Sequence, residues 1–190
     1  MKEMEENELI KACIKNDRTA YTQLFNRYAP KMLMVCSRYM SDEDEAKDVL
    51  QNGFIKVFKS LKSFKFKGSF EGWLKRIMVN EALGALRQKK KLIFDNNSFH
   101  ENMEVAEENE ELPAYDFTQE ELLHALKTLP EAYKAVFNLY CFEKYSHKEI
   151  ASVLSIKIET SRSRLLRARK LLKEQLFDLA TQKSKLNENG

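Results

Sequence analysis

The side chains with the most distinctive chemistry are aromatic rings and cations that alternate in the stretch from residue 62 to residue 76. In chain order they are Lys62, Phe64, Lys65, Phe66, Lys67, Phe70, Trp73, Lys75 and Arg76. An exposed ring can stack on an unpaired base while ammonium and guanidinium groups neutralise phosphate, so the pattern is typical of single-stranded nucleic-acid binding. The alternative is that the rings fill a core, which we expect at least in part for Phe70 and Trp73.

A second pattern, between Tyr145 and Leu172, follows the rules of a helix-turn-helix motif. Ser146 with Glu149 matches a capping box, residues 155–157 fit a tight turn, and a second helix starts at Glu159–Thr160. The spacing therefore predicts two short helices at an angle, the arrangement with which many proteins enter the major groove of DNA.

Helical periodicity gives the second of these helices two faces. One face points to a core and carries Leu165, Ala168 and Leu172. The opposite face carries Arg162, Ser163, Leu166, Arg167 and Lys170. Such a strip can contact base edges and phosphates, whereas Arg164 and Arg169 lie at its flanks, where phosphate contact or surface ion pairing is expected.

A helix predicted from Ala46 to Leu61 has a third candidate surface. Its apolar stripe consists of Ala46, Val49, Leu50, Gly53, Phe54, Val57, Phe58 and Leu61. The opposite face carries Asp48, Gln51, Asn52, Ile55 and Lys59. An exposed isoleucine among polar groups fits a protein-docking face about as well as a plain solvated face, and the sequence leaves both interpretations open.

Catalysis has no candidate residues in this sequence. There is no HxE with CxxC, no carboxylate cluster with metal-ligand spacing and no glycine-rich phosphate loop, and His100, His124 and His147 are far apart. Cys13, Cys36 and Cys141 fit neither a disulfide framework nor a zinc site. We therefore expect a protein without enzymatic activity, metal or cofactor, with its cysteines reduced in helical cores.

The charge of the chain is segregated, although the net charge is only +3. From Lys56 to Lys91 eleven Lys and Arg face Glu71 and Glu81 alone, an excess of nine, while residues 92–121 hold ten acidic residues and no Lys or Arg. The acidic stretch cannot bury enough apolar surface to offset its ordering entropy, so it predicts a flexible linker between two basic modules that attract polyanions.

The composition predicts an all-α protein. Only five glycines and three prolines interrupt 190 residues, of which 43% are hydrophobic. Apolar stripes at 122–129 and 132–140, separated by Pro130, predict two helices ahead of the helix-turn-helix motif. No run of about 18 apolar residues exists to span a bilayer.

The N-terminal module is expected to contain helices with particular boundaries. We predict a helix over residues 8–27 with a break near Asn16–Asp17, and a second helix opened by Pro30. Ser41 with Asp44 resembles the N-cap signal of the helix that follows. The first ten residues, MKEMEENELI, carry four glutamates and do not fit a signal peptide, so we expect a cytoplasmic protein without membrane insertion.

In combination these segments resemble the bacterial RNA polymerase sigma factors of the extracytoplasmic-function (ECF) group in the sigma-70 family. The resemblance covers about residues 20–176. DVLQNGFIKVFKSL looks like the family's core-polymerase-binding helix, and FKGSFEGWLKRIMVN looks like its promoter-melting and minus-10-reading segment. LPEAYKAVF followed by HKEIASVLSIKIETSRSRLLRARKLL looks like its minus-35-reading domain.

The resemblance implies three sets of functional residues. Contacts with core polymerase fall on Asp48, Gln51, Asn52 and Ile55. Minus-10 contacts fall on Lys62, Phe64, Lys65, Phe66, Lys67, Trp73, Arg76, Asn80 and Arg87. Minus-35 contacts fall on His147, Lys148, Thr160, Arg162, Ser163, Leu166, Arg167 and Lys170. Asn52, Gly84 and Ser155 depart from the family pattern, which commonly has an acidic residue, an aspartate and a turn glycine there.

The same resemblance implies a domain plan and partners. Residues 1–91 would form sigma domain 2, 92–117 the acidic linker, 118–180 sigma domain 4 and 181–190 a disordered tail. The free protein would be a monomer that binds core RNA polymerase at the clamp helices of the largest subunit and at the flap, and promoter DNA as duplex and single strand. An anti-sigma factor is the expected regulator, and the linker would thread toward the RNA exit path.

Two other functions stay open from the sequence alone. A stand-alone helix-turn-helix regulator would bind duplex DNA without polymerase, but it would have no use for the aromatic cluster between Phe64 and Trp73. A pure protein-interaction module would show no salt-dependent affinity for DNA.

Overall fold

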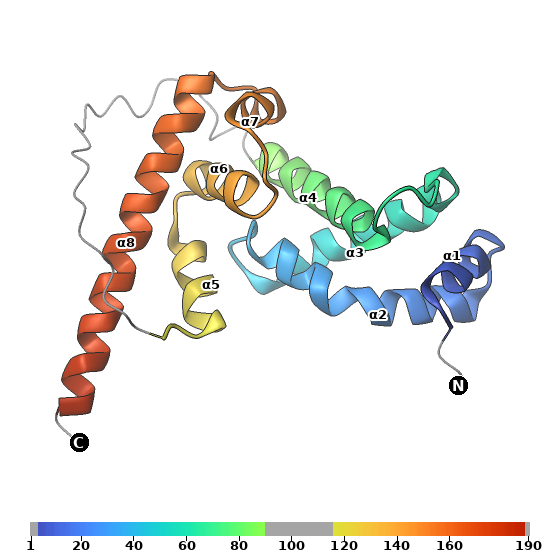
Figure 1. The fold of residues 1–190 in the computed structure, drawn as a ribbon, viewed down its shortest axis with the longest axis horizontal. Coiled ribbons are helices and arrows are strands. Elements are labelled where there is room, and N and C mark those ends of the chain that lie inside the picture. Colours follow the sequence, from blue (N-terminus) through green and yellow to red (C-terminus); the bar gives the residue numbers. More distant parts are fainter. Residues whose placement is uncertain (1–3, 90–115, 189–190) are drawn as a thin grey trace. The chain divides into compact units, whose positions relative to one another are not determined.

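The computed structural model describes residues 4–89 and 116–188. The chain divides between Lys89 and Lys90 into two compact units, each with a core of its own (Figure 1). Every regular element of the described residues is a helix, as the composition predicts. The segment predicted as an acidic linker, 92–117, lies outside the described residues except for its last two positions.

Unit 1 contains four α-helices and one short turn. They are α1 (Glu6–Ile14), α2 (Arg18–Ser37), α3 (Glu43–Ser60), a 3-10 turn (Leu61–Ser63) and α4 (Phe70–Lys89). The predicted break between the first two helices is confirmed: Asn16 has a φ of 64°, and the Asp17 side chain accepts hydrogen bonds from the backbone N–H groups of Thr19 and Ala20. This cap fixes the start of α2.

Two predicted boundaries in unit 1 are wrong. Pro30 does not open a helix but lies inside α2, on its exposed side. Proline has no N–H, so one carbonyl group of the preceding turn has no helical partner. On the exposed side, water can donate a hydrogen bond to that carbonyl group. The N-cap of α3 is Asp42 rather than Ser41, and its carboxylate accepts from the Glu45 N–H at 2.8 Å. A carboxylate is also favoured at a helix N-terminus by the helix dipole.

In unit 1, α3 packs against both α2 and α4. Its predicted apolar stripe is buried from Ala46 to Val57, and the buried face of α4 includes Leu74 and Met78. A Cβ atom on Gly53 would overlap the sulfur of Met78, so the glycine allows α3 and α4 to approach closely. The side chains on the other face of α3 are thereby held outward.

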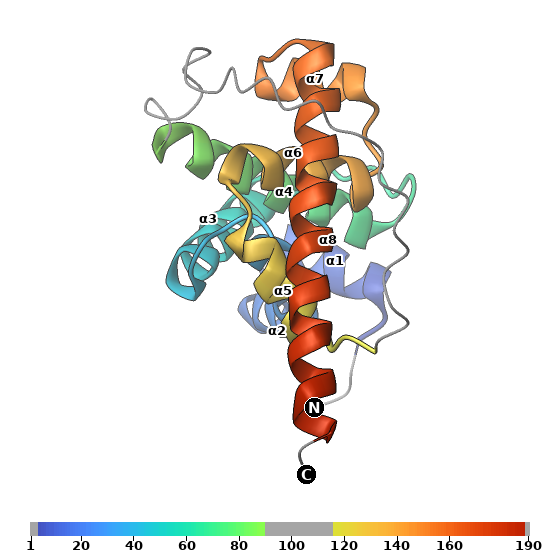
Figure 2. The ribbon, with the colours of Figure 1, turned by 90° about the vertical axis from the view of Figure 1, so that its left-hand side faces the viewer.

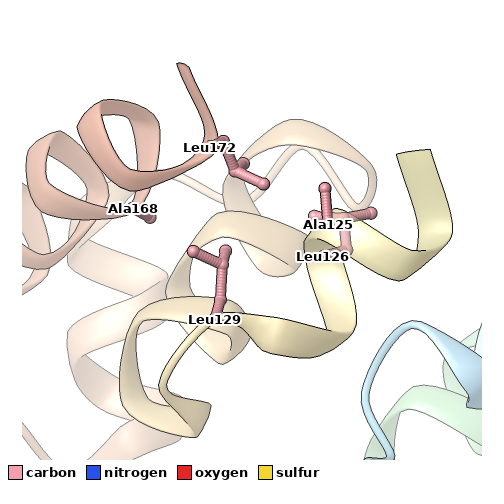
Figure 3. Packing of buried hydrophobic residues seen from close by; sticks show 5 residues of the cluster. All are labelled: Ala125, Leu126, Leu129, Ala168 and Leu172. Atoms are coloured by element: carbon pink, nitrogen blue, oxygen red, sulfur yellow. The ribbon is translucent and has the colours of Figure 1, made fainter. Parts of the chain in front are cut away.

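The described part of unit 2 consists of α5 (Gln119–Thr128), α6 (Glu131–Cys141), α7 (His147–Leu154) and α8 (Ile158–Glu188). Figure 2 shows α6 and α7 beside the first half of α8, with α5 farther along the same helix. One core cluster joins α5 to α8 and contains Ala125, Leu126, Leu129, Ala168 and Leu172 (Figure 3). The predicted helices before the helix-turn-helix motif are therefore confirmed, and they form the support on which α8 lies.

The C-terminal end of α8 differs from the sequence prediction. Residues 181–188 continue the helix, where a disordered tail was expected from residue 181. Ala180 is buried, and the Lys183 ammonium lies 2.6 Å from a carboxylate oxygen of Glu121 and 5.9 Å from the centre of the Phe117 ring. These tertiary contacts stabilise a sequence whose composition alone favours disorder.

The three cysteines are unbridged, as expected. Cys13 and Cys36 are buried, and Cys141 is half-buried. Burial raises the pKa of the Cys13 thiol to about 11 and that of Cys36 to about 12. Both thiols are therefore protonated and behave as small apolar side chains.

Residues 4–89 and 116–188 contain neither a metal-binding cluster nor a helix suited to span a membrane. No group of three His, Cys, Asp or Glu side chains in these ranges is placed to hold a metal ion. None of the helices there is both long and apolar enough to cross a bilayer.

Candidate nucleic-acid interface

The aromatic and basic segment of unit 1 is a loop between the 3-10 turn and α4. Phe66 has a φ of 55° and Gly68 a φ of 84°, so two backbone positions lie in the left-handed region. For a phenylalanine this conformation is an outlier with a cost of about 1–2 kcal/mol. It places the Phe66 ring outward, with 42% of the residue exposed, among the exposed side chains of Lys62, Lys65 and Lys67.

The four rings of this segment form one cluster but differ in exposure. The Phe64 ring centre lies 5.1 Å from those of Phe66 and Phe70 and 5.5 Å from that of Trp73. Phe64 is only 7% exposed, so the expectation that its ring meets a base is wrong: it packs in the core beneath its neighbours. Phe70 is buried as predicted, which leaves Phe66 and the half-buried Trp73 to present ring surface.

Helix α4 continues this surface with polar side chains. Arg76, Asn80 and Arg87 are exposed and share one face, because their spacings of four and seven residues are close to whole helical turns. Asn80 lines a groove of about 430 Å³ between α3 and α4, together with Lys56, Lys59, Ser60, Ile77 and Glu81. The Lys56 ammonium lies 2.6 Å from the Glu81 carboxylate.

Sequence reasoning did not include Lys56 and Ser60 in this surface. Lys56 was counted in the local basic excess, but its position on α3 carried no sign of a neighbour on α4. Only the packing of the two helices brings both residues to the groove that Asn80 lines. The pairing of the helices, rather than the periodicity of either one, was the missing information.

The predicted docking strip on α3 lies on the surface along its whole length. Asp48, Gln51, Asn52 and Lys59 are exposed, and Ile55 is 45% exposed although it is the strip's only apolar residue. The opposite face of α3 is in the core, as the stripe predicts. The strip therefore offers an apolar centre surrounded by hydrogen-bonding groups, which is the composition of a protein interface.

The helix-turn-helix geometry of unit 2 is confirmed in detail. The Ser146 hydroxyl accepts from the Glu149 N–H, and the Glu149 carboxylate accepts from the Ser146 N–H at 2.8 Å, which completes the capping box. Ser155 ends α7 with a φ of 54°, and the Ile156 N–H donates to the Ala151 carbonyl. Serine thus adopts the left-handed turn position that glycine usually fills.

The strip on α8 has the predicted orientation. Leu165, Ala168 and Leu172 are buried. Arg162, Ser163 and Leu166 are exposed, Leu166 to 40%, while Arg167, Lys170 and Thr160 are half-buried. The Ser163 hydroxyl donates to the Thr160 carbonyl at 3.1 Å, so its remaining capacity toward DNA is as an acceptor.

His147 is more constrained than the sequence suggests. Its Nδ1 lies 3.0 Å from the hydroxyl oxygen of buried Ser161, and its ring stacks on Tyr140 with centres 4.8 Å apart. Burial lowers the pKa of His147, and the charges of Arg162 and Arg169 lower it further. Lys148, the next residue, is exposed. Tyr140 was not predicted at this site, because nothing in the sequence indicates that a tyrosine on a core helix contacts His147.

Comparison with known proteins places the two units in one family. A model of Sigma-70 region 2 matches residues 24–92, and a model of Sigma-70 region 4 matches residues 119–172. Over 180 residues the chain is 31% identical to the ECF RNA polymerase sigma-E factor of Escherichia coli (strain K12), a match that covers 90% of this chain and 94% of that protein. The chain belongs to the ECF sigma factors of the sigma-70 family. Its function is that of a sigma factor, in place of the stand-alone regulator that the sequence left open.

Other relatives of this sigma factor are similar over nearly their whole length. The RNA polymerase sigma-H factor of Pseudomonas aeruginosa is 28% identical over 184 residues, 92% of this chain and 95% of that protein. The ECF RNA polymerase sigma factor SigW of Bacillus subtilis is 28% identical over 185 residues, with coverages of 90% and 96%.

A solved structure shares the fold. The sigma factor RpoE in complex with the anti-sigma factor NepR from Bartonella quintana matches with a TM-score of 0.50 and 22% identity, over 82% of this chain and 96% of that one.

Proposed function

We propose that this sigma factor divides promoter recognition between its units along the surfaces described above. The strip of Asp48, Gln51, Asn52 and Ile55 binds core RNA polymerase. The loop from Lys62 to Lys67, with Trp73, Arg76, Asn80 and Arg87 of α4, contacts the minus-10 element. The strip of Arg162, Ser163, Leu166, Arg167 and Lys170, with His147, Lys148 and Thr160, contacts the minus-35 element. In this assignment Phe64 supports Phe66 and does not touch DNA.

The observation that carries the minus-10 assignment is the outward Phe66 ring on a left-handed backbone. The Phe66 ring keeps one face on Phe64 and exposes the rest at the cost of a strained backbone, and such outliers concentrate at functional sites. Stacking of an unpaired base on a ring contributes about 1–3 kcal/mol, which offsets the few kcal/mol that base unstacking costs. Promoter melting would then be driven by capture of a base near Lys62–Phe70.

The minus-35 assignment is supported by the rigidity of the helix-turn-helix motif. The capping box at Ser146 fixes the start of α7, and the contact between His147 and Ser161 links α7 to α8 before DNA binds. Arg162 can then make a bidentate contact to guanine, and Leu166 can touch a thymine methyl group.

The partner assignment follows the family and the solved relative. The RpoE structure from Bartonella quintana contains an anti-sigma factor, and we propose a regulator of this class that covers the polymerase- and DNA-binding faces of the present chain. The remaining parts of the proposal are a monomer in the free state, polymerase contacts at the clamp helices and the flap, and action in the cytoplasm, with domains at 1–91 and 118–180.

The decisive experiment is transcription in vitro with core RNA polymerase from the source organism and its genomic fragments as template. Specific transcripts should appear only when the protein is added. Ile55→Asp should abolish copurification with core polymerase. Phe66→Ala should still copurify but should lose promoter opening, measured by permanganate footprints. Arg162→Ala should weaken duplex binding. Phe177→Ala is the matched control, since this ring is 50% exposed but lies outside the three surfaces. Initiation that is unaffected by all three substitutions would refute the assignment.

A further inference from the structure

The ring of Tyr140 on α6 is a meeting point for side chains from two other helices. The His147 imidazole, at the start of α7, stacks on it at an interplanar angle of 25°. The Arg169 guanidinium carbon of α8 lies 5.7 Å from the ring centre, within cation–π range. One ring therefore orients an imidazole and a guanidinium at the edge of the proposed minus-35 surface.

The orientation of His147 determines which of its nitrogens can meet a ligand. Its Nδ1 is engaged with the Ser161 hydroxyl, and Ser161 itself is fully buried. Any contact with a ligand therefore uses Nε2, on the far side of the ring from this anchor. A ring held by a stack and a hydrogen bond loses little further entropy when it binds.

Positive charge converges on the same place from α8. Arg162 and Arg169 are both exposed, and because they are seven residues apart they lie on the same side of the helix, two turns from one another. Both guanidinium groups act on the imidazole electrostatically, since each lowers the pKa of His147. Two guanidinium groups and an imidazole that are close enough to interact form a suitable environment for a phosphate.

We propose that Arg169 and His147, oriented by Tyr140 and assisted by Arg162, bind one backbone phosphate of duplex DNA beside the base-reading strip. The inference rests on the proposed duplex binding by unit 2. It chooses phosphate contact over surface ion pairing for Arg169, and it adds Tyr140 as a positioning residue. A phosphate contact of this kind fixes the register of α8 on the duplex and carries no sequence information itself.

A salt titration of the full-length protein on a labelled duplex of random sequence tests the contact. Loss of one phosphate contact reduces the slope of log K against log salt by about 0.9, so Arg169→Gln should lower the magnitude of the slope by this amount. The matched control is Lys185→Gln, which removes the same charge from the far end of α8. If Arg169→Gln and Lys185→Gln have the same slope as the wild type, the phosphate site is wrong, although duplex binding stands.

The role of Tyr140 is tested by combining its substitution with that of Arg169 and comparing the salt slopes. Tyr140→Leu removes the ring and should reduce the slope as Arg169→Gln does, and Arg169→Gln in the Tyr140→Leu background should then change little. Tyr140→Phe keeps the ring and should restore the wild-type slope. A merely structural role would lower the melting temperature without changing the slope. If Tyr140→Leu does not fold, Arg169→Gln alone still decides whether the phosphate contact exists.

A pH profile tests the contribution of His147. The titratable and charged groups that face its ring are Tyr140 from α6 and Arg162 and Arg169 from α8. A bound phosphate favours the protonated imidazole, so duplex affinity should rise as the pH falls toward the lowered pKa of His147, below its ordinary 6.5, and His147→Gln should remove this rise. A wild-type profile identical to that of His147→Gln would exclude His147 from the site. If the wild type does not bind duplex DNA at any salt concentration, the proposed function of unit 2 fails as well.

Discussion

The two units present their proposed nucleic-acid surfaces on different kinds of backbone. Unit 1 uses a loop with two positive φ angles, at Phe66 and Gly68, and exposes an aromatic ring there. Unit 2 uses one face of α8, a regular helix of 31 residues whose other face is buried. The comparison shows that a surface suited to an irregular, unpaired base depends on local strain, whereas a surface suited to a regular duplex depends on helical periodicity.

The largest expected effect tests whether the two units unfold independently of one another. Leu74 in unit 1 and Leu139 in unit 2 are both fully buried. Leu74→Ala should cost about 2–5 kcal/mol in unit 1 alone, and Leu139→Ala should cost a similar amount in unit 2 alone. Hydrogen exchange of peptides from each unit measures this. Leu122→Ala, at a residue that is 42% exposed, is the control, and loss of protection in both units from one substitution would contradict the separation.

The next prediction distinguishes the strained, exposed ring of Phe66 from the buried ring of Phe64 in the unit 1 loop. Phe66→Gly should lower affinity for a single-stranded oligonucleotide by about 1–3 kcal/mol while unit 1 keeps its stability to within about 1 kcal/mol, because glycine adopts a positive φ without strain. Phe64→Ala should instead cost about 3–5 kcal/mol of stability, since that ring is in the core.

Fluorescence quenching and thermal unfolding read out the two quantities for Phe66→Gly and Phe64→Ala. Equal losses of stability in the two variants would show that Phe66 is a core residue in solution.

A smaller effect is expected at Ser155, which is one of two non-glycine residues with a left-handed backbone in the described part of unit 2, the other being Lys144. Ser155→Gly should stabilise unit 2 by about 0.5–1 kcal/mol, because the φ of 54° at the end of α7 is costly for serine and not for glycine. Ser155→Val should destabilise it, since a branched Cβ fits this conformation poorly. Thermal denaturation of the full chain measures both, and a glycine variant less stable than the wild type would contradict the prediction.

The smallest effect concerns acid and the C-terminal part of α8. Lys183, and then the Thr118 cap, lower the pKa of the Glu121 carboxyl from its ordinary value of 4.5. A carboxyl with a depressed pKa stabilises the fold at pH values above its unfolded pKa, and this contribution is lost as the pH falls through the folded value. Unit 2 should therefore weaken below about pH 4.5, and Lys183→Met should reduce this pH dependence in thermal unfolding scans. An unchanged dependence would show that the ion pair is screened by solvent.

The parts of the fold that sequence reasoning predicted are those set by periodicity and capping. The stripes of α3 and α8, the break at Asn16 and the capping box at Ser146 were all identified correctly. Pro30 was misassigned because its effect depends on which side of α2 it occupies. The continuation of α8 past residue 180 was missed because it depends on tertiary contacts that the local sequence does not indicate.

The candidate site was predictable where one helix presents it and not where two helices share it. The strips on α8 and α3 follow from the helical periodicity of the sequence alone. The groove that joins Lys56 to Asn80, and the stack of His147 on Tyr140, depend on contacts between residues far apart in sequence. The burial of Phe64 against the exposure of Phe66 likewise depends on a backbone conformation that residue types did not reveal.

The length of α8 means that the autonomous folding unit is larger than the family motif. The region 4 match ends at residue 172, yet Leu176 packs against the cluster that holds α5, Ala180 is buried, and Gln175 accepts a hydrogen bond from Thr128. A chain that stopped at the motif boundary would keep the proposed base-reading strip but lose the contacts of residues 175–180 with α5 that support it. The evolutionary unit that defines the family and the physical unit that folds are therefore different in this protein.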